Sequence, residues 1–232
     1  MDAQQSIDFT HLAPSPQAVS TEKAGYSGVV ALLHSGSALK PLSVTVGLGG
    51  QGFVSEGRAL TLRYPNFFVC SVYSPNSGEG LKRLDYRLKE WEPALGAHLR
   101  TLDAEAPVLL LGDLNVAHLD SDIWNVGAKH LPKSAGTTPE ERAAFSTLLS
   151  TNRLVDVFRH FFPTACGCFT YWSQRAGNRP FNRGLRLDYS LAASRLLEAT
   201  DGLRVSDALL LPSEATLGLS DHGPVGCVLS GV

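Results

Sequence analysis

The sequence is poor in the features that mark secreted, disulfide-stabilised or membrane proteins. It has only 4 cysteines among its 232 residues and no Cys-x-x-Cys pair, which argues against a disulfide framework and provides no zinc or redox motif. It has no apolar run of the about 18 residues that a membrane-spanning helix needs. Its first residues lack the basic-then-apolar order of a secretory signal. We therefore expect a soluble, intracellular protein that does not bind membranes.

A strong excess of charge of either sign is absent as well. The net charge is −2 and the isoelectric point is about 6.4. This balance argues against a protein that coats nucleic acid by bulk charge, but it leaves room for a local basic groove. Basic residues gather in two groups, Lys82, Arg83 and Arg87, and then Arg175, Arg179, Arg183 and Arg186. A solvated surface explains the first group, whereas the second is interleaved with aromatic residues, as in grooves that bind nucleic acid.

The chain is long and apolar enough, with 44% hydrophobic residues, to bury one sizeable core. Residues 1–24 are polar, carry two prolines and show no sustained period, so we interpret them as a tail or linker. Residues 25–232 form the expected single domain. Strand-like apolar segments lie at residues 27–34, 58–64, 67–73, 107–111, 169–172, 185–192, 203–209 and 224–229.

Two helices are expected between these strands. Apolar residues recur at three- and four-residue spacing over residues 81–102, which predicts an amphipathic helix on a sheet, bent or divided near Pro93 and Gly96. Thr138 and Glu141 predict a helix start with a capping box. Strands mixed with so few helices favour an α/β or α+β layered sandwich over a strictly alternating parallel fold.

The segment with the clearest chemistry covers residues 107–118. An apolar run typical of a buried strand is followed by Asp113 and Asn115, two residues apart and therefore on one side of an extended chain. Alone, these two residues would be typical of a turn. However, Asp188 lies inside another apolar segment, where a buried acid is costly unless it is paired, and we infer a hydrogen bond from His222 to Asp188. Together these groups predict metal-assisted phosphoryl chemistry.

These residues belong to a series of motifs in a fixed order. The motifs are Tyr73-Ser-Pro-Asn76, Gly-Asp113-Leu-Asn115-Val-Ala-His118, Ser134-Ala-Gly-Thr-Thr-Pro139-Glu-Glu-Arg142, Phe169-Thr-Tyr171-Trp172, Gly184-Leu-Arg186-Leu-Asp188-Tyr189 and Ser220-Asp221-His222. From about Gly25 to its C-terminus the chain resembles the exonuclease III and AP endonuclease 1 family of DNA repair nucleases, within the wider endonuclease/exonuclease/phosphatase superfamily. The resemblance implies a four-layered α/β sandwich of two sheets flanked by helices, with the site at one edge.

The resemblance also implies an activity. It is that of a Mg²⁺-dependent hydrolase, with Mn²⁺ as an alternative ion, that cuts the DNA backbone 5′ to an abasic site and trims blocked 3′ ends. Asp113 would orient or deprotonate the attacking water, and Asn115 would hold that water and the phosphate. His222, kept charged by Asp188, would stabilise the developing phosphorane charge. Tyr73 would contact the scissile phosphate.

Further roles follow from the same resemblance. Asn76 and Arg83 would bind the DNA strand, and Tyr171 and Leu185 would wall the pocket that receives the flipped-out abasic sugar. Asp221 would sit near the metal or the DNA. The implied metal ligands are Asp113, Asn115, Asp221 and His222. We expect a monomer that binds double-stranded DNA with abasic sites, in the nucleus or a DNA-containing organelle.

The chain departs from the family pattern at its start. Family members begin with two strand-containing units, one ending in an Asn and an Asp near the site and the next carrying a Gln-Glu-Thr segment whose Glu is a principal Mg²⁺ ligand. Neither pattern occurs in residues 1–24. We therefore expect an N-terminally truncated sandwich with uncovered strand edges, weaker metal binding and reduced activity.

A second departure is Leu185, which stands where the family usually has a tryptophan and would loosen the abasic pocket. Two other functions remain open at this point. One is a non-catalytic relic that binds DNA or a partner. The other is a phosphatase or RNA deadenylase of the same fold, against which the Ala-Gly-x-Thr-Pro segment and the arginine-rich residues 175–186 argue.

Overall fold

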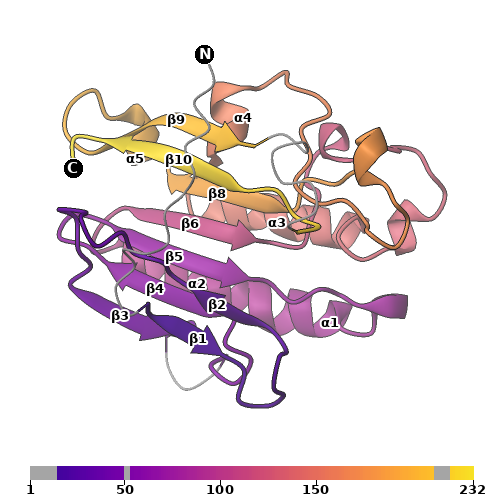
Figure 1. The fold of residues 1–232 in the computed structure, drawn as a ribbon, viewed down its shortest axis with the longest axis horizontal. Helices are drawn as coiled ribbons and strands as arrows, with labels where there is room; N and C mark the ends of the chain where they lie inside the picture. The colour runs from indigo at the N-terminus through magenta and orange to yellow at the C-terminus, as the bar shows by residue number, and fades with distance from the viewer. Residues whose placement is uncertain (1–14, 50–52, 212–219) are drawn as a thin grey trace.

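The computed structural model describes residues 15–49, 53–211 and 220–232. A mixed sheet of six strands, in the order β3-β4-β5-β6-β8-β7, lies at the centre (Figure 1). Its strands are β3 (Ser43–Val46), β4 (Ala59–Arg63), β5 (Phe68–Tyr73), β6 (Val108–Asp113), β8 (Asp188–Ala193) and β7 (Leu154–Asp156). Strands β5 and β6 are parallel, and the other neighbours are antiparallel. The parallel pair places the ends of β5 and β6 at the same edge.

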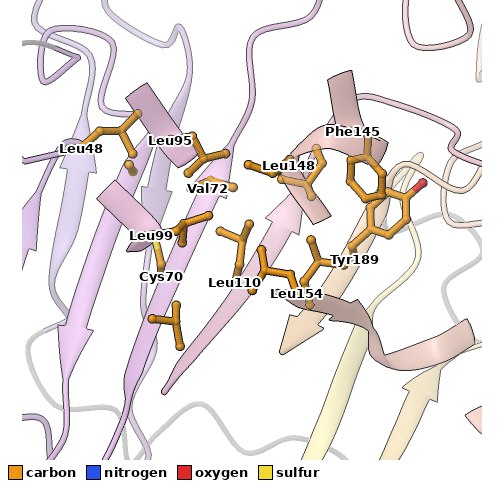
Figure 2. Close-up of a cluster of buried hydrophobic side chains, with 14 of the residues drawn as sticks. Leu48, Cys70, Val72, Leu95, Leu99, Leu110, Phe145, Leu148, Leu154 and Tyr189 are labelled. Carbon is orange, nitrogen blue, oxygen red and sulfur yellow. The ribbon is translucent and has the colours of Figure 1, made fainter. Parts of the chain in front are cut away.

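Helices cover one face of this sheet. They are α1 (Leu84–Tyr86), a π-helical turn (Arg87–Trp91), α2 (Glu92–Asp103) and α3 (Pro139–Thr151). Figure 2 shows Leu95 and Leu99 of α2 packed over Cys70, Val72 and Leu110 of the strands. The apolar spacing predicted in residues 81–102 therefore forms the buried face of a helical segment. This segment is divided, as predicted, since a π-turn precedes Pro93 in the first turn of α2.

The start of α3 is also confirmed. The Thr138 hydroxyl accepts a hydrogen bond from the Glu141 backbone N–H at 3.1 Å, and the Glu141 carboxylate accepts one from the Thr138 backbone N–H at 3.2 Å. This reciprocal capping box satisfies two amides that would otherwise be unpaired at the helix end. It fixes the helix whose Leu148 and Phe145 complete the core (Figure 2).

The opposite face of the sheet carries two pairs of antiparallel strands. One pair is β1 (Gln17–Val19) with β2 (Gly28–Val30), and the other is β9 (Arg204–Leu210) with β10 (Val225–Ser230). Two short helices, α4 (Val157–Phe161) and α5 (Arg195–Glu198), pack against β9 and β8. Figure 1 shows the two strand pairs in front of the central sheet and α2 and α3 behind it. The structure thus confirms an α/β sandwich built from two sheet layers and helices.

Several sequence-based expectations need correction. Gln17–Val19 forms β1, so the prediction of a tail over residues 1–24 is wrong for these residues, while residues 1–14 lie outside the described part. The strand predicted at residues 169–172 does not form, and only Tyr171 makes isolated bridges there. The reason is that the Thr170 hydroxyl accepts the backbone N–H groups of Leu187 and Asp188, which replaces a regular ladder. Strands β3 and β7 were not expected from the sequence.

Within the described ranges, no helix combines the length and the apolar character required to cross a membrane.

Candidate active site

Three strand ends bring three site residues side by side. In the parallel register of β5 and β6, Tyr73 lies opposite Asp113, and in the antiparallel register of β6 and β8, Asp113 lies opposite Asp188. Residues directly opposite each other on neighbouring strands point to the same face of the sheet. The sheet therefore places a phenol and two carboxylates in one row.

The turn after β6 requires glycine at its entrance. Gly112 has a φ of +130°, and a Cβ atom there would lie 2.0 Å from the Val72 carbonyl oxygen. No other residue fits this close approach of two backbones. The strand then ends in a tight turn in which Asn115 adopts a left-handed φ of 49°.

This turn locks Asn115 onto Asp113. The Asn115 backbone N–H donates to one Asp113 carboxylate oxygen at 2.8 Å, and its side-chain amide donates to the other at 3.1 Å. The same amide donates to the Ser74 carbonyl oxygen at 2.9 Å, and its oxygen accepts from the Asn76 side chain at 2.8 Å. Only 4% of Asn115 is exposed. The predicted residues Asn76, Asn115 and Asp113 thus form one hydrogen-bonded chain.

A buried arginine, Arg87, stabilises the turn that follows β6. Arg87 is fully buried and donates to the carbonyl oxygens of Leu114 and Asn115, each at 2.6 Å. It also forms ion pairs with Glu92 and Glu141. Since an unpaired buried charge is costly, this arrangement stabilises one conformation of the turn. The prediction that Arg87 belongs to a solvated surface is therefore wrong.

His222 and Asp188 form the hydrogen bond inferred from the sequence, with His222 Nδ1 2.8 Å from an Asp188 carboxylate oxygen. Burial lowers the pKa of His222, but the hydrogen bond and charge of Asp188, with the charges of Asp113 and Asp221, outweigh it and raise the pKa to about 9. His222 is therefore charged near neutral pH.

The carboxyl group of Asp113 is shifted as well. Burial raises its pKa, and the charge of Asp188 raises it further, to about 7, against the opposing effects of His222 and the Asn115 backbone N–H. The carboxyl group of Asp113 and the charged imidazole of His222 thus hold their protons in different pH ranges. A group with a pKa near the working pH is suited to general base chemistry.

A group of side chains that could hold a metal ion lies at the same place. Asp113, Asp188 and His222 each offer a ligand atom, and these atoms lie within 4.8 Å of one another. Mg²⁺ in proteins is typically held by one or two carboxylates together with waters and substrate phosphate. The two carboxylates fit that donor set. Protonated His222 does not, because a metal ligand must be a neutral imidazole.

Tyr73 is held by residues that were not predicted from the sequence. The Arg58 guanidinium lies 4.8 Å from the Tyr73 ring centroid and 5.3 Å from that of Tyr26, and it donates to the Tyr73 carbonyl oxygen at 3.1 Å. Glu56 pairs with Arg58 and with Arg83, the latter at 2.7 Å. Burial and the charge of Asp113 raise the pKa of Tyr73, so its phenol remains protonated. The only signal in the sequence was a charged residue beginning an apolar strand.

The predicted pocket residues also come together. Tyr171 and Leu185 form a bridge with each other and line a pocket of about 240 Å³. Tyr171 forms a second bridge with His222, and the two ring centroids are 5.1 Å apart. The pocket therefore adjoins the catalytic candidates.

Two residues predicted for the site, Arg83 and Asp221, are not part of the row formed by Tyr73, Asp113 and Asp188. Arg83 belongs to the cluster with Glu56 and Tyr26. Asp221 lies beside His222, where its charge raises the pKa of that histidine, but it is not part of the group that could hold a metal ion among the described residues.

Sequence comparisons identify relatives of this chain. The pattern of the Endonuclease/Exonuclease/phosphatase family matches residues 8–222. The chain is 41% identical over 208 residues to an exodeoxyribonuclease of Bacillus subtilis, covering 90% of this chain and 76% of the relative. It is 40% identical over 212 residues to a DNA-(apurinic or apyrimidinic site) endonuclease of Dictyostelium discoideum, covering 91% of this chain and 55% of the relative. The chain thus spans about half of that second protein.

Comparison with solved structures identifies the same kind of relatives. The AP endonuclease LMAP of Leishmania major superposes with a TM-score of 0.82 at 30% identity, over 94% of this chain and 70% of that one. The catalytic domain of Xenopus laevis APE2, at 24% identity and a TM-score of 0.79 over 95% of this chain and 76% of that one, shares the fold. The chain therefore belongs to the endonuclease/exonuclease/phosphatase family, on the branch of the exodeoxyribonucleases and AP endonucleases.

Proposed function

We propose that this protein is a DNA repair nuclease that hydrolyses the DNA backbone 5′ to abasic sites and also trims 3′ ends. The observation that carries the proposal is the row of Tyr73, Asp113 and Asp188 at adjacent strand ends, with His222 paired to Asp188. Relatives named as exodeoxyribonuclease and as DNA-(apurinic or apyrimidinic site) endonuclease support the substrate class.

Asp113 is proposed as the group that orients the attacking water and accepts its proton. Its pKa of about 7 leaves a substantial fraction ionised at neutral pH, when it can take a proton. The two hydrogen bonds from Asn115 fix the direction of both carboxylate oxygens. Asn115 is thus proposed to position the general base Asp113 as well as the phosphate.

His222 and Tyr73 are proposed to stabilise charge on the phosphate. His222 is protonated below its pKa of about 9, so it presents a positive charge where negative charge develops in the transition state. Tyr73, with its raised pKa, keeps the proton that it would donate in a hydrogen bond to a phosphate oxygen. Asp188 acts through His222, which it orients and keeps charged.

We further propose Mg²⁺ as the metal, with Mn²⁺ as an alternative, held by Asp113 and Asp188 with waters and the substrate phosphate. When bound, such an ion neutralises phosphate charge and acidifies a bound water. Of the other ligands implied by the family resemblance, Asn115 and Asp221 remain predictions, whereas a protonated His222 does not suit a metal ion.

The pocket beside His222 is proposed to receive the abasic sugar. Its two walls, Tyr171 and Leu185, are apolar surfaces that suit a deoxyribose without a base. Asn76 and Arg83 are proposed to contact the DNA strand. We propose that the protein acts as a monomer on double-stranded DNA, in the nucleus or a DNA-containing organelle.

The test is incision of a duplex that carries a single abasic analogue, with Mg²⁺ or with EDTA. We expect incision 5′ to the analogue that requires the metal and is lost in Asp113→Ala. Asp85→Ala, which removes an exposed carboxylate in an ion pair with Lys89, serves as the matched control. Binding without incision, or incision that survives Asp113→Ala, would contradict the proposal.

A further inference from the structure

Two large aromatic side chains that the proposed mechanism does not use stand exposed near the pocket. Trp124 is 43% exposed and Phe181 is 69% exposed. The Arg183 guanidinium lies over both rings, 5.2 Å from the Trp124 centroid and 5.1 Å from the Phe181 centroid. Single exposed apolar residues are common on protein surfaces. Here two exposed rings share one guanidinium, and we call the group of Trp124, Phe181 and Arg183 the platform.

Backbone contacts join the platform to the proposed catalytic residues. The Trp124 N–H donates to the Gly184 carbonyl oxygen at 3.1 Å, and the preceding Ile123 forms a bridge with Leu185. Leu185 in turn bridges Tyr171, which bridges His222. Trp124 and Arg183 also line the same pocket as Tyr171 and Leu185. The platform therefore stands at the rim of the pocket proposed for the abasic sugar.

The charge of the surrounding chain favours an anionic partner. Residues 123–139 and residues 157–187 contain no Asp or Glu, although the whole chain has a net charge of −2. These two segments hold seven basic residues, Lys129, Lys133, Arg159, Arg175, Arg179, Arg183 and Arg186. Arg159 and Arg186 form ion pairs with the buried acids Asp122 and Asp156. Within the described ranges Arg183 forms no ion pair, so its charge is available to a ligand.

We propose that Trp124, Phe181 and Arg183 form a stacking surface for an unpaired nucleobase of the DNA next to the pocket. The inference rests on the proposed function, since it assigns this base to the same substrate. Aromatic rings and a planar guanidinium stack on any base, and the positive charge attracts the neighbouring phosphates. A duplex that lacks one base supplies such a partner, because the base opposite the gap has no pairing partner. A base next to the abasic site, once it is displaced from its pair, is the second source.

The experiment measures binding in EDTA, so that no strand is cut, with 2-aminopurine as the fluorescent base. In one duplex 2-aminopurine lies opposite the abasic analogue, and in a second it is the neighbouring base on the same strand. A fully paired duplex serves as the reference. We expect the fluorescence of one of the two abasic duplexes to be quenched on binding, which identifies the stacked base. Quenching in neither duplex would overturn the proposal.

Substitutions connect this signal to the platform. Trp124→Ala is expected to remove the quenching and to weaken binding of that abasic duplex about tenfold, the usual effect of losing a stacked base. Trp124→Phe should keep both, because it retains an aromatic face. Arg183→Lys should lose most of the quenching although the charge remains. Phe162→Ala, at an aromatic residue that is 43% exposed in the same acid-free segment, is the matched control and should change neither.

The outcomes separate this inference from the proposed function. If Trp124→Ala binds every duplex as the unsubstituted protein does, the platform does not stack on a base. If Trp124→Ala weakens the fully paired duplex equally, Trp124 is a general DNA contact and the inference is also overturned. If the unsubstituted protein shows the Trp124-dependent signal but does not incise with Mg²⁺, the proposed nuclease function fails and the platform stands.

Discussion

The strand-end residues and the pocket rim differ in rigidity and in exposure to solvent. At the strand ends, Asp113 and Asn115 are locked by hydrogen bonds and by the buried Arg87. At the rim, Trp124 lies in a turn and Phe181 ends a short 3₁₀-helix (Arg179–Phe181), and both side chains are exposed. A rigid site is needed where protons and charge move, because small displacements are costly to rate. The comparison predicts that substitutions at strand ends act on rate or folding, and those at the rim on affinity.

The strongest way to break the strand-end site is Gly112→Ala. The added Cβ would meet the Val72 carbonyl oxygen at 2.0 Å, so two neighbouring strands must separate. We expect a loss of about 4 kcal/mol or more in the free energy of unfolding, measured by urea denaturation. Gly78→Ala is the control, since Gly78 has a φ of +75° with nothing within 4 Å of its added Cβ. A similar loss in both variants would show that backbone strain, not the strand contact, is responsible.

His222→Ala removes the positive charge proposed at the developing phosphate charge. We expect the incision rate at saturating DNA to fall by about 10²–10³, as for other charge-stabilising groups, with a change in affinity of only a few fold. Single-turnover incision measures the rate, and anisotropy measures the affinity. His160→Ala, at an exposed histidine of α4, should leave both unchanged. A loss of affinity with an unchanged incision rate in His222→Ala would show that His222 acts in binding, like the residues of the rim, and not in catalysis.

Asp188→Asn should change the titration of His222. In the folded protein the His222 pKa is raised to about 9 from an ordinary value of 6.5. This pair therefore contributes stability that is fully present below about pH 6.5 and is lost as the pH rises through about 9. We expect NMR titration of the metal-free protein to show a lower His222 pKa in Asp188→Asn. The stability difference from the unsubstituted protein, roughly 2–3 kcal/mol at pH 6, should shrink by pH 10.

An unchanged His222 titration in Asp188→Asn would mean that other groups keep this histidine charged. Asp221→Asn is the matched comparison, because the charge of Asp221 raises the His222 pKa less than Asp188 does. It should lower that pKa less than Asp188→Asn does.

The smallest expected effect is at the pocket wall. Leu185→Trp adds a larger flat surface to a pocket of about 240 Å³, and we expect affinity for an abasic duplex to rise about threefold with an unchanged incision rate. Leu42→Trp, at a leucine that is 65% exposed, controls for added aromatic surface. Weaker binding in Leu185→Trp would show that the pocket is already filled by its own side chains.

Parts of the site could be predicted because their residues carry a local signal. Asp113 follows an apolar strand, and an acid inside the strand of Asp188 needs a partner, which His222 supplies. Tyr26, Glu56 and Arg58 could not be predicted, because their meeting with Tyr73 depends on how distant loops fold together. Such contacts leave no period in the sequence.

In the fold as well, features encoded by neighbouring residues could be predicted, and features that depend on distant contacts could not. The amphipathic helix and the capping box at Thr138 are encoded within a few residues of each other and were predicted. Strands β1 and β7 have three residues each, too few to show an alternating pattern. The strand expected at residues 169–172 failed because Thr170 uses its side chain in place of a ladder. Local apolar pattern predicted the core strands, and side-chain hydrogen bonds decided the loops.

The most direct test of the division between strand ends and rim compares two variants in one measurement. Single-turnover incision at increasing protein concentration gives the maximal rate and the apparent affinity together. We expect Asp113→Asn to lower the maximal rate by about 10³ or more with affinity within a few fold, and Trp124→Ala to weaken affinity about tenfold with an unchanged maximal rate. The reverse pattern, or the same pattern in both variants, would contradict this division.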